Sequence, residues 1–394
     1  MVTMRVCLLL FWSLVLFETA AQTADSTQTD IVNIVFGKKK KQAVDKVRDD
    51  RKVYFSILPA AVSVPGGGRA VITSINAAFY TGDPANTNLS NVYLIPYTNL
   101  ADRYGVYLRP NVWLAKNTFN FIGDYRLAHF PQYTWGLGGN TPEWDQSLID
   151  SDYVRIYQNA LLQLYKGHWY AGPGYALDYH YNISENYPYE NGHLERYGDT
   201  TRTATSSSGF TFNIVYDARK NAINPQGGSY FLISWRWNER NLGSTFTNNS
   251  LFIDSRKYFS LSKERVSLIA LRSYYWTVLN GDTPYLDLPS TNWAPNSGIA
   301  SRGFEIGRYR SNAMLYGEIE HRYQLSANGL WGFVAFANLS SASEFNTQQF
   351  KYWQVGSGVG VRLKLNKYSN ANLAMDLAFS KNYWSVWLNI GEMF

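Results

Sequence analysis

The sequence predicts an all-β protein, a sixteen-stranded antiparallel transmembrane β-barrel. Three observations support this fold class. Apolar and polar residues alternate with a period of two along many segments, each long enough to cross a hydrocarbon layer as a tilted strand, which takes about 9–11 residues. Short connections between these segments alternate with long ones. Beyond the first segment of the chain there is no run of about 18 apolar residues, as a membrane-spanning helix requires.

The composition narrows the class of protein further. Aromatic residues make up 16% of the 394 residues and charged residues only 17%, which excludes an intrinsically disordered chain. The formal net charge is +6, but the basic residues are spread along the chain, whereas nucleic-acid-binding proteins concentrate them. We therefore expect no nucleic acid among the partners.

The first 21 residues have the three parts of a secretory signal peptide. Arg5 precedes an apolar run over residues 6–17, and small residues follow up to Ala21. We expect cleavage near Ala21. The only cysteine, Cys7, lies in this signal, so the mature chain is predicted to form no disulfide and no cysteine-based zinc site.

Residues 22–52 are polar and are predicted to form a periplasmic leader or linker before a barrel that covers residues 53–394. The leader contains four consecutive lysines, Lys38–Lys41. Such a run suits either contact with anionic headgroups or a partner, or a simple solvated stretch of charge.

The barrel region divides into sixteen two-faced segments. In the last one, Trp384, Val386 and Leu388 share one face, while Ser385 and Asn389 share the other. In a membrane barrel the apolar face meets lipid and the polar face meets the lumen. The predicted strands lie near residues 53–64, 69–80, 91–99, 104–115, 119–130, 153–165, 168–182, 209–219, 229–238, 251–262, 265–279, 313–325, 331–342, 352–365, 372–380 and 383–394.

The connections alternate in length in the second half of the chain. The turns at 166–167 and 263–264 are short, and the longest connection covers residues 280–312. Short periplasmic turns and long external loops produce this asymmetry in bacterial outer-membrane barrels. We therefore expect the chain in the bacterial outer membrane, with outer-membrane lipids as its first partners.

The end of the chain carries a recognisable pattern. Residues 386–394 continue the alternation to a terminal aromatic residue, and the last predicted strand includes all of them. This pattern resembles the C-terminal β-signal by which outer-membrane barrels are recognised for insertion. On that resemblance the signal residues are Trp387, Asn389, Gly391 and Phe394.

Four stretches occur in an order typical of one family. They are Asp217–Arg219 with the turn 224–228, Arg302-Gly303-Phe304 in the longest connection, Gly356–Arg362, and Met375-Asp376. Together they resemble the BamA/TamA-like bacterial surface antigen family of outer-membrane β-barrels. The resemblance covers roughly residues 53–394 and is strongest in the second half of the chain.

The resemblance implies that the long loop folds back into the lumen. There Arg302, with Gly303 and Phe304, would dock against acidic groups on the barrel wall. Glu320 best matches the family's acidic partner, Glu318 could substitute for it, and Asp376 lies on a closing strand. A buried guanidinium does require carboxylate or carbonyl partners. The alternative is that these charges simply line a wet lumen.

Two features depart from the family pattern. Asn338 occupies a place where the family usually has Asp, so that one carboxylate is lost. In addition, many family members carry periplasmic POTRA modules before the barrel, and residues 22–52 are too few for one. The predicted protein is therefore a POTRA-less member.

The resemblance implies a role in outer-membrane assembly, meaning protein insertion or translocation. Partners would then be periplasmic assembly factors or client barrel proteins, with no cofactor and no small-molecule substrate. The alternative function is a passive, porin-like channel or a structural barrel. A lipid hydrolase or acyltransferase is the least favoured reading, because no G-x-S-x-G motif occurs and the five histidines are scattered. That scatter also gives no support for a metal site.

Overall fold

A computed structural model describes residues 28–31, 34, 53–64, 68–98, 102–165, 167–189, 191–198, 203–219, 221–262, 266–295 and 300–394. The predicted signal peptide at 1–21 and the lysine run Lys38–Lys41 lie outside the described residues, as does most of the predicted leader.

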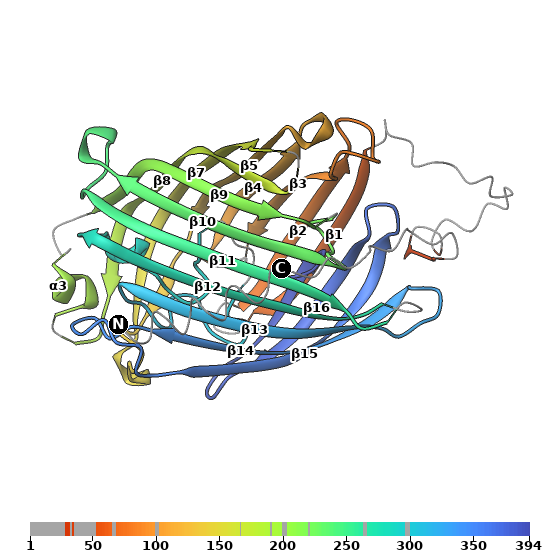
Figure 1. Ribbon diagram of the computed structural model, residues 1–394. Helices are drawn as coiled ribbons and strands as arrows, with labels where there is room; N and C mark the ends of the chain where they lie inside the picture. Colours follow the sequence, from red (N-terminus) through yellow and green to blue (C-terminus); the bar gives the residue numbers. More distant parts are fainter. Residues whose placement is uncertain are drawn as a thin grey trace, which may run out of the picture.

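The described chain forms sixteen long antiparallel strands and one short one, which confirms the predicted fold class (Figure 1). The short strand, β6, adds only to the edge of β7. In the part of the chain that the structure describes, no helix is long and apolar enough to span a membrane. The strands are β1 (Tyr54–Val64), β2 (Gly68–Phe79), β3 (Ser90–Thr98), β4 (Tyr104–Trp113), β5 (Phe119–His129), β6 (Gln132–Thr134), β7 (Ser147–Gln163), β8 (Trp169–Asn186), β9 (Ala204–Asp217), β10 (Gly228–Asn238), β11 (Asn248–Ser260), β12 (Ser267–Gly281), β13 (Ala313–Gln324), β14 (Trp331–Ala342), β15 (Gln354–Asn366), β16 (Ala371–Phe379) and β17 (Trp384–Ile390).

Besides residues 31 and 34, which are helical and precede the barrel, the described helical segments are short turns in the connections between strands. They are η1 (Ala115–Asn117), η2 (Glu143–Asp145), α3 (His193–Tyr197), η3 (Arg240–Leu242) and η4 (Tyr285–Asp287).

The barrel is nearly closed. Each long strand forms a ladder with the next one along the chain, from the pair β1 and β2 to the pair β16 and β17. Strands β1 and β17 come within 8 Å of each other between Cα atoms, yet no ladder joins them among the described residues. We call this junction the seam.

The two faces of the strands separate as the alternation predicts. On β15, Val355 and Val359 point outward and are exposed, whereas Gly360 and Arg362 point into the lumen and are buried. An outer surface of this kind suits lipid, and an inner surface of this kind must satisfy its charges within the protein.

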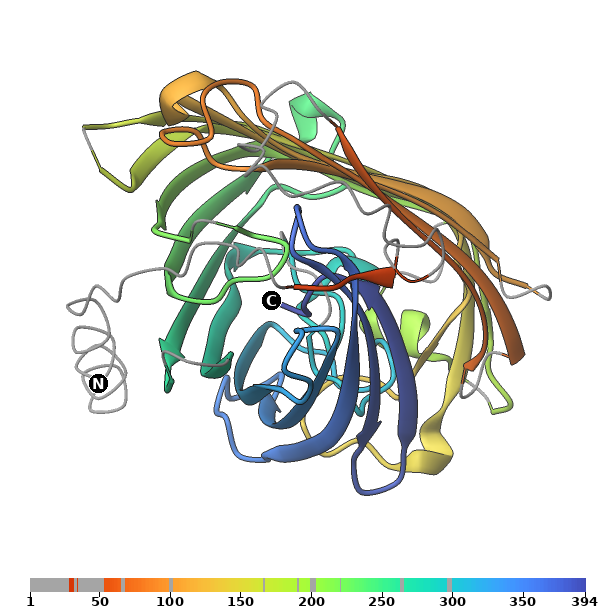
Figure 2. The same ribbon diagram turned by 90° about the vertical axis from the view of Figure 1, so that its right-hand side faces the viewer.

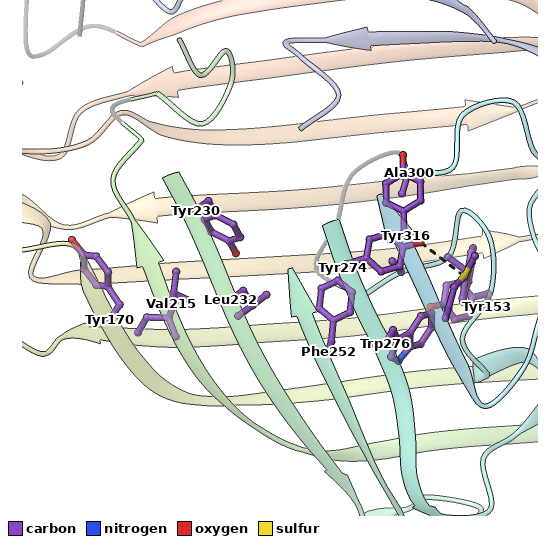
Figure 3. Packing of buried hydrophobic residues seen from close by; sticks show 14 of the residues in the cluster. Tyr153, Tyr170, Val215, Tyr230, Leu232, Phe252, Tyr274, Trp276, Ala300 and Tyr316 are labelled. Carbon is purple, nitrogen blue, oxygen red and sulfur yellow. Dashed lines mark hydrogen bonds between the residues drawn. The ribbon is translucent and has the colours of Figure 1, made fainter. Parts of the chain in front are cut away.

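Side chains fill much of the lumen. Aromatic rings from neighbouring strands gather on the inner wall, and Tyr274 stacks on Tyr316 with ring centroids 4.8 Å apart (Figure 3). Ala300, from the connection between β12 and β13, lies against the same cluster. A loop therefore shares the core of the barrel with the strands.

The end of the chain departs from the prediction. Strand β17 stops at Ile390, so the expectation that the last strand runs to residue 394 is wrong. Gly391 has a φ of +95°, a left-handed conformation that glycine adopts without strain, and it turns the chain inward. Met393 and Phe394 are buried, and the C-terminus lies inside the barrel (Figure 2).

Candidate functional site: a charge cluster in the lumen

The connection between β12 and β13 folds into the lumen, as the resemblance implied. Its helical turn η4 and most of its described residues are buried. Gly303 makes the tight turn that the approach requires, with a φ of +94°. A Cβ atom at this position would lie 2.7 Å from the carbonyl oxygen of Phe379, so the loop can come this close to the wall only with glycine.

Arg302 carries the contact of this loop with the wall. Its guanidinium is fully buried and donates to Glu318 and Glu320 on β13 and to Asp376 on β16. The contact between Arg302 Nη2 and Glu320 Oε2 measures 2.5 Å. All three acidic residues named from the sequence thus meet the same arginine.

The contacts extend beyond Arg302 into a continuous network. Arg322 Nε lies 2.5 Å from Glu320 Oε1, Arg362 Nη1 lies 2.5 Å from Asp376 Oδ1, and Arg362 Nε lies 2.7 Å from Glu392 Oε2. We call this set the lumen charge cluster, and its members are Arg302, Glu318, Glu320, Arg322, Arg362, Asp376 and Glu392. Three guanidinium groups share four carboxylates, so each buried charge has an opposite charge beside it.

Neutral groups hold Arg302 from its other sides. The ring of Phe336 lies 3.5 Å from the guanidinium carbon, a favourable cation–π arrangement. Asn338 Nδ2 donates to the backbone oxygen of Arg302 at 2.9 Å. At the place where the family usually has a carboxylate, this chain therefore binds the loop backbone through an amide.

Replacing Asn338 with alanine should destabilise the folded barrel by about 1–3 kcal/mol, because it leaves a buried carbonyl of the loop without its donor. Unfolding by urea in lipid vesicles measures the change. Asn249 is the matched control, since its amide also donates one hydrogen bond, to Asn280 Oδ1, but that bond is exposed. Equal losses in the two variants would contradict a role for Asn338 in holding the loop.

Glycines make room for the cluster on β15. The register places Gly356 opposite Asn338 and Gly360 opposite Asp376. A Cβ at Gly356 would lie 2.8 Å from the oxygen of Arg302, and one at Gly360 would lie 1.8 Å from Asp376 Oδ1. The G-x-G-x-R pattern on this strand thus has a steric reason.

The remaining predicted residues lie close by. Phe304 is buried and its ring packs edge-on against Tyr309, with centroids 6.1 Å apart. Asn389 Nδ2 donates to the backbone oxygen of Glu392, and Trp387 Nε1 donates to Ser385 Oγ. The role of these residues and of Phe394 in a β-signal remains a prediction.

Sequence reasoning missed some members of the cluster. The period-two alternation does place Arg322 and Arg362 on the lumen face, but it does not show which residues they bind. Glu392 was missed altogether, because the alternation gives no sign of the inward turn at Gly391. A further network centred on Asp178 was also missed, in which Arg155 Nε and Arg236 Nη1 lie 2.9 and 2.7 Å from the carboxylate oxygens.

The loop is also fastened to the opposite wall. Asp287 of η4 accepts a hydrogen bond of 2.6 Å from Ser207 Oγ, and its other carboxylate oxygen lies 3.1 Å from His180 Nε2. The carboxylate stands between the serine and the histidine, so this is not a nucleophile activated by a base. Arg302 attaches the loop to the wall on the other side. The loop therefore crosses the lumen and is bonded at both ends, and we call it the strut.

Among the described residues, no group of three or more His, Cys, Asp or Glu side chains is placed to hold a metal ion. What the site offers is a set of buried ion pairs between a loop and the barrel wall.

The chain is similar to a known protein family and to solved structures. The model of the Omp85 superfamily domain matches residues 115–385, well over half of the chain. None of the curated proteins matches. Among solved structures, CdiB from Acinetobacter baumannii is similar with a TM-score of 0.54 and 12% identity over 86% of this chain, which spans 60% of that protein. BamA from Haemophilus ducreyi lacking POTRA domains 1–3 is similar with a TM-score of 0.49 and 14% identity, over 86% of this chain and 68% of that one.

The family match and the barrel fold lead to the same assignment as the motifs. The chain belongs to the Omp85 superfamily and is an outer-membrane β-barrel.

Proposed function

We propose that this protein takes part in outer-membrane assembly, by inserting or translocating client proteins without any bond chemistry. The observation that carries the proposal is the seam, where β1 and β17 lie close together without a ladder among the described residues. Unpaired strand edges can template an incoming strand by main-chain hydrogen bonds. Client barrel proteins and periplasmic assembly factors are the partners that this role requires.

The filled lumen supports this role over that of a wide passive channel. A sixteen-stranded barrel leaves an aqueous channel unless something occupies it. Here the loop with Arg302 crosses the lumen and is bonded to both walls. In the proposed mechanism, the lumen charge cluster keeps this strut in place and braces β13, β15 and β16 while the seam opens.

Depletion of the protein, followed by quantitative proteomics of the outer membrane, tests the proposal. The expected result is a joint fall of several other barrel proteins, with their unfolded precursors accumulating in the periplasm. An unchanged outer-membrane proteome would exclude the assembly role. A high, steady ion conductance in planar bilayers would then favour the channel.

A further inference from the structure

One connection at the short-turn end of the barrel folds inward. It joins β9 to β10, and at its base the guanidinium of Arg219 makes a two-pronged contact with Asp217 at 2.9 and 2.8 Å. Ile223 and Asn224 at its tip are buried. We call residues 221–225 the inward turn. In Figure 2, which looks onto this end, it reaches from its strands toward the C-terminus in the interior.

The inward turn binds the turn between β15 and β16, on the other side of the barrel. Asn221 Nδ2 donates to the oxygen of Ser369 at 2.8 Å, and Asn224 Nδ2 donates to the oxygen of Asn370 at 3.1 Å. Strands β9 and β10 are half-way around the barrel from the seam in strand order. The inward turn therefore links the wall opposite the seam to the turn between β15 and β16. Strand β16 pairs with β17, which forms one side of the seam.

The inward turn also binds the end of the chain. We call Gly391–Phe394 the tail. The amide of Glu392 donates to the oxygen of Ile223 at 2.8 Å, and Arg322 donates both to the oxygen of Pro225, at 3.3 Å, and to that of Phe394, at 3.0 Å. The tail is thus held between the inward turn and the lumen charge cluster.

The same region bridges the seam. Ile223 belongs to a buried cluster with Ala78 of β2 and Ile390 of β17, which lie on opposite sides of the seam. Tyr93 of β3 donates its hydroxyl to the oxygen of Ile390 at 3.1 Å. The ring of Tyr54, at the start of β1, also stacks on that of Tyr368 in the β15–β16 turn, with centroids 5.5 Å apart. Side chains therefore join the short-turn end of the seam where no ladder does.

We propose that Asn221, Ile223 and Asn224 are positioning residues that keep the tail in the lumen and thereby keep the short-turn end of the seam shut. The tail has a second available state, because its sequence continues the alternation of β17 to Phe394. Released from the inward turn, it can lengthen β17 as a free strand edge. This inference rests on the proposed function, because holding the seam shut has a role only if the seam opens during assembly. We call the contacts of the inward turn with the tail and with the β15–β16 turn the clasp.

A labelling experiment reads the position of the tail directly. Met393 is replaced by cysteine in the full chain with Cys7 changed to serine, which leaves a single cysteine. A maleimide carrying a polyethylene glycol chain, too bulky for the filled lumen, is applied to isolated outer membranes. Replacing both Asn221 and Asn224 with alanine should raise the labelling rate by roughly tenfold, since the inward turn loses the two hydrogen bonds that hold it against the β15–β16 turn, and the tail depends on the inward turn.

The control is Asn238→Ala. This change removes a buried amide whose Nδ2 donates to Asn248 Oδ1 at 2.9 Å, near the other end of the barrel. Its labelling rate should equal that of the parent. Equal rates in all three proteins would overturn the inference, as would fast labelling of the parent.

A second experiment, with a pair of cysteines, tests the inference if the Met393 variant does not accumulate. Cysteines at positions 221 and 369, joined by oxidation, should lock the inward turn to the β15–β16 turn and block client assembly until reductant is added. Full assembly by the locked protein would refute the clasp. Depletion without any effect on other barrels, together with responsive labelling, would instead refute only the assembly role.

Discussion

Replacing Arg302 with methionine is expected to destabilise the barrel by about 3–5 kcal/mol, more than any other single substitution in the loop. The side chain is fully buried, and its removal leaves Glu318, Glu320 and Asp376 short of a positive charge in the lumen. Less of the protein should reach the membrane in folded form. Urea unfolding in lipid vesicles and the heat-dependent shift on electrophoresis measure the two effects.

The matched control is Arg308→Met in the same loop. Arg308 donates to Thr141 and pairs with Glu143 at 2.9 Å, but the glutamate side chain is 56% exposed, so removing this arginine leaves no buried carboxylate without a partner and should cost less. A compensating variant sharpens the test. Adding Glu318→Gln and Asp376→Asn to Arg302→Met should recover part of the loss, because fewer carboxylates then lack a partner. Similar losses for the two arginine variants would argue against the cluster as the anchor of the loop.

Replacing Gly360 with alanine is expected to cost about 3 kcal/mol, although it adds only one methyl group. That methyl carbon would lie 1.8 Å from Asp376 Oδ1 and 2.9 Å from Arg362 Nη1. Asp376 cannot move aside cheaply, because both Arg302 and Arg362 hold its carboxylate. The substitution therefore breaks ion pairs in addition to crowding the wall.

Gly317→Ala on β13 provides the comparison. No atom lies within 4 Å of a Cβ built at Gly317, so this variant should stay within about 0.5 kcal/mol of the parent. Urea unfolding of the two alanine variants in the same vesicles gives the difference. If Gly360→Ala proved as stable as Gly317→Ala, the close fit of Asp376 against β15 would be disproved.

Period-two alternation predicted the barrel well, because a strand between lipid and a polar lumen has no other way to satisfy both sides. It placed all sixteen strands and assigned Glu318, Glu320 and Asp376 to the lumen face. That Arg302 would lie near them came from the resemblance, since alternation contains no information about which loop enters a barrel.

The tail and the role of Asn338 could not be predicted, for different reasons. Gly391 is compatible with a strand, and the contacts that follow its left-handed turn, those of Glu392 with Ile223 and Arg362, join residues far apart in the sequence. At position 338 the sequence shows the loss of a carboxylate, but the gain of an amide bond to the loop backbone depends on how deeply the loop descends.

The strands of the barrel wall differ in length, and this has a consequence for the cell surface. Strands β7 and β8 have 17 and 18 residues, and their stretches 147–151 and 182–186 extend past their pairing with β5 and β9. At about 3.3 Å per residue and a tilt near 40°, such strands rise roughly 45 Å, about 20 Å more than the apolar band of an outer-membrane barrel. At the long-loop end, β7 and β8 therefore extend beyond their neighbours β5 and β9, and the short helix α3 follows β8 there. An antibody or phage that reaches this end of the barrel would meet a surface built of paired strands as well as loops.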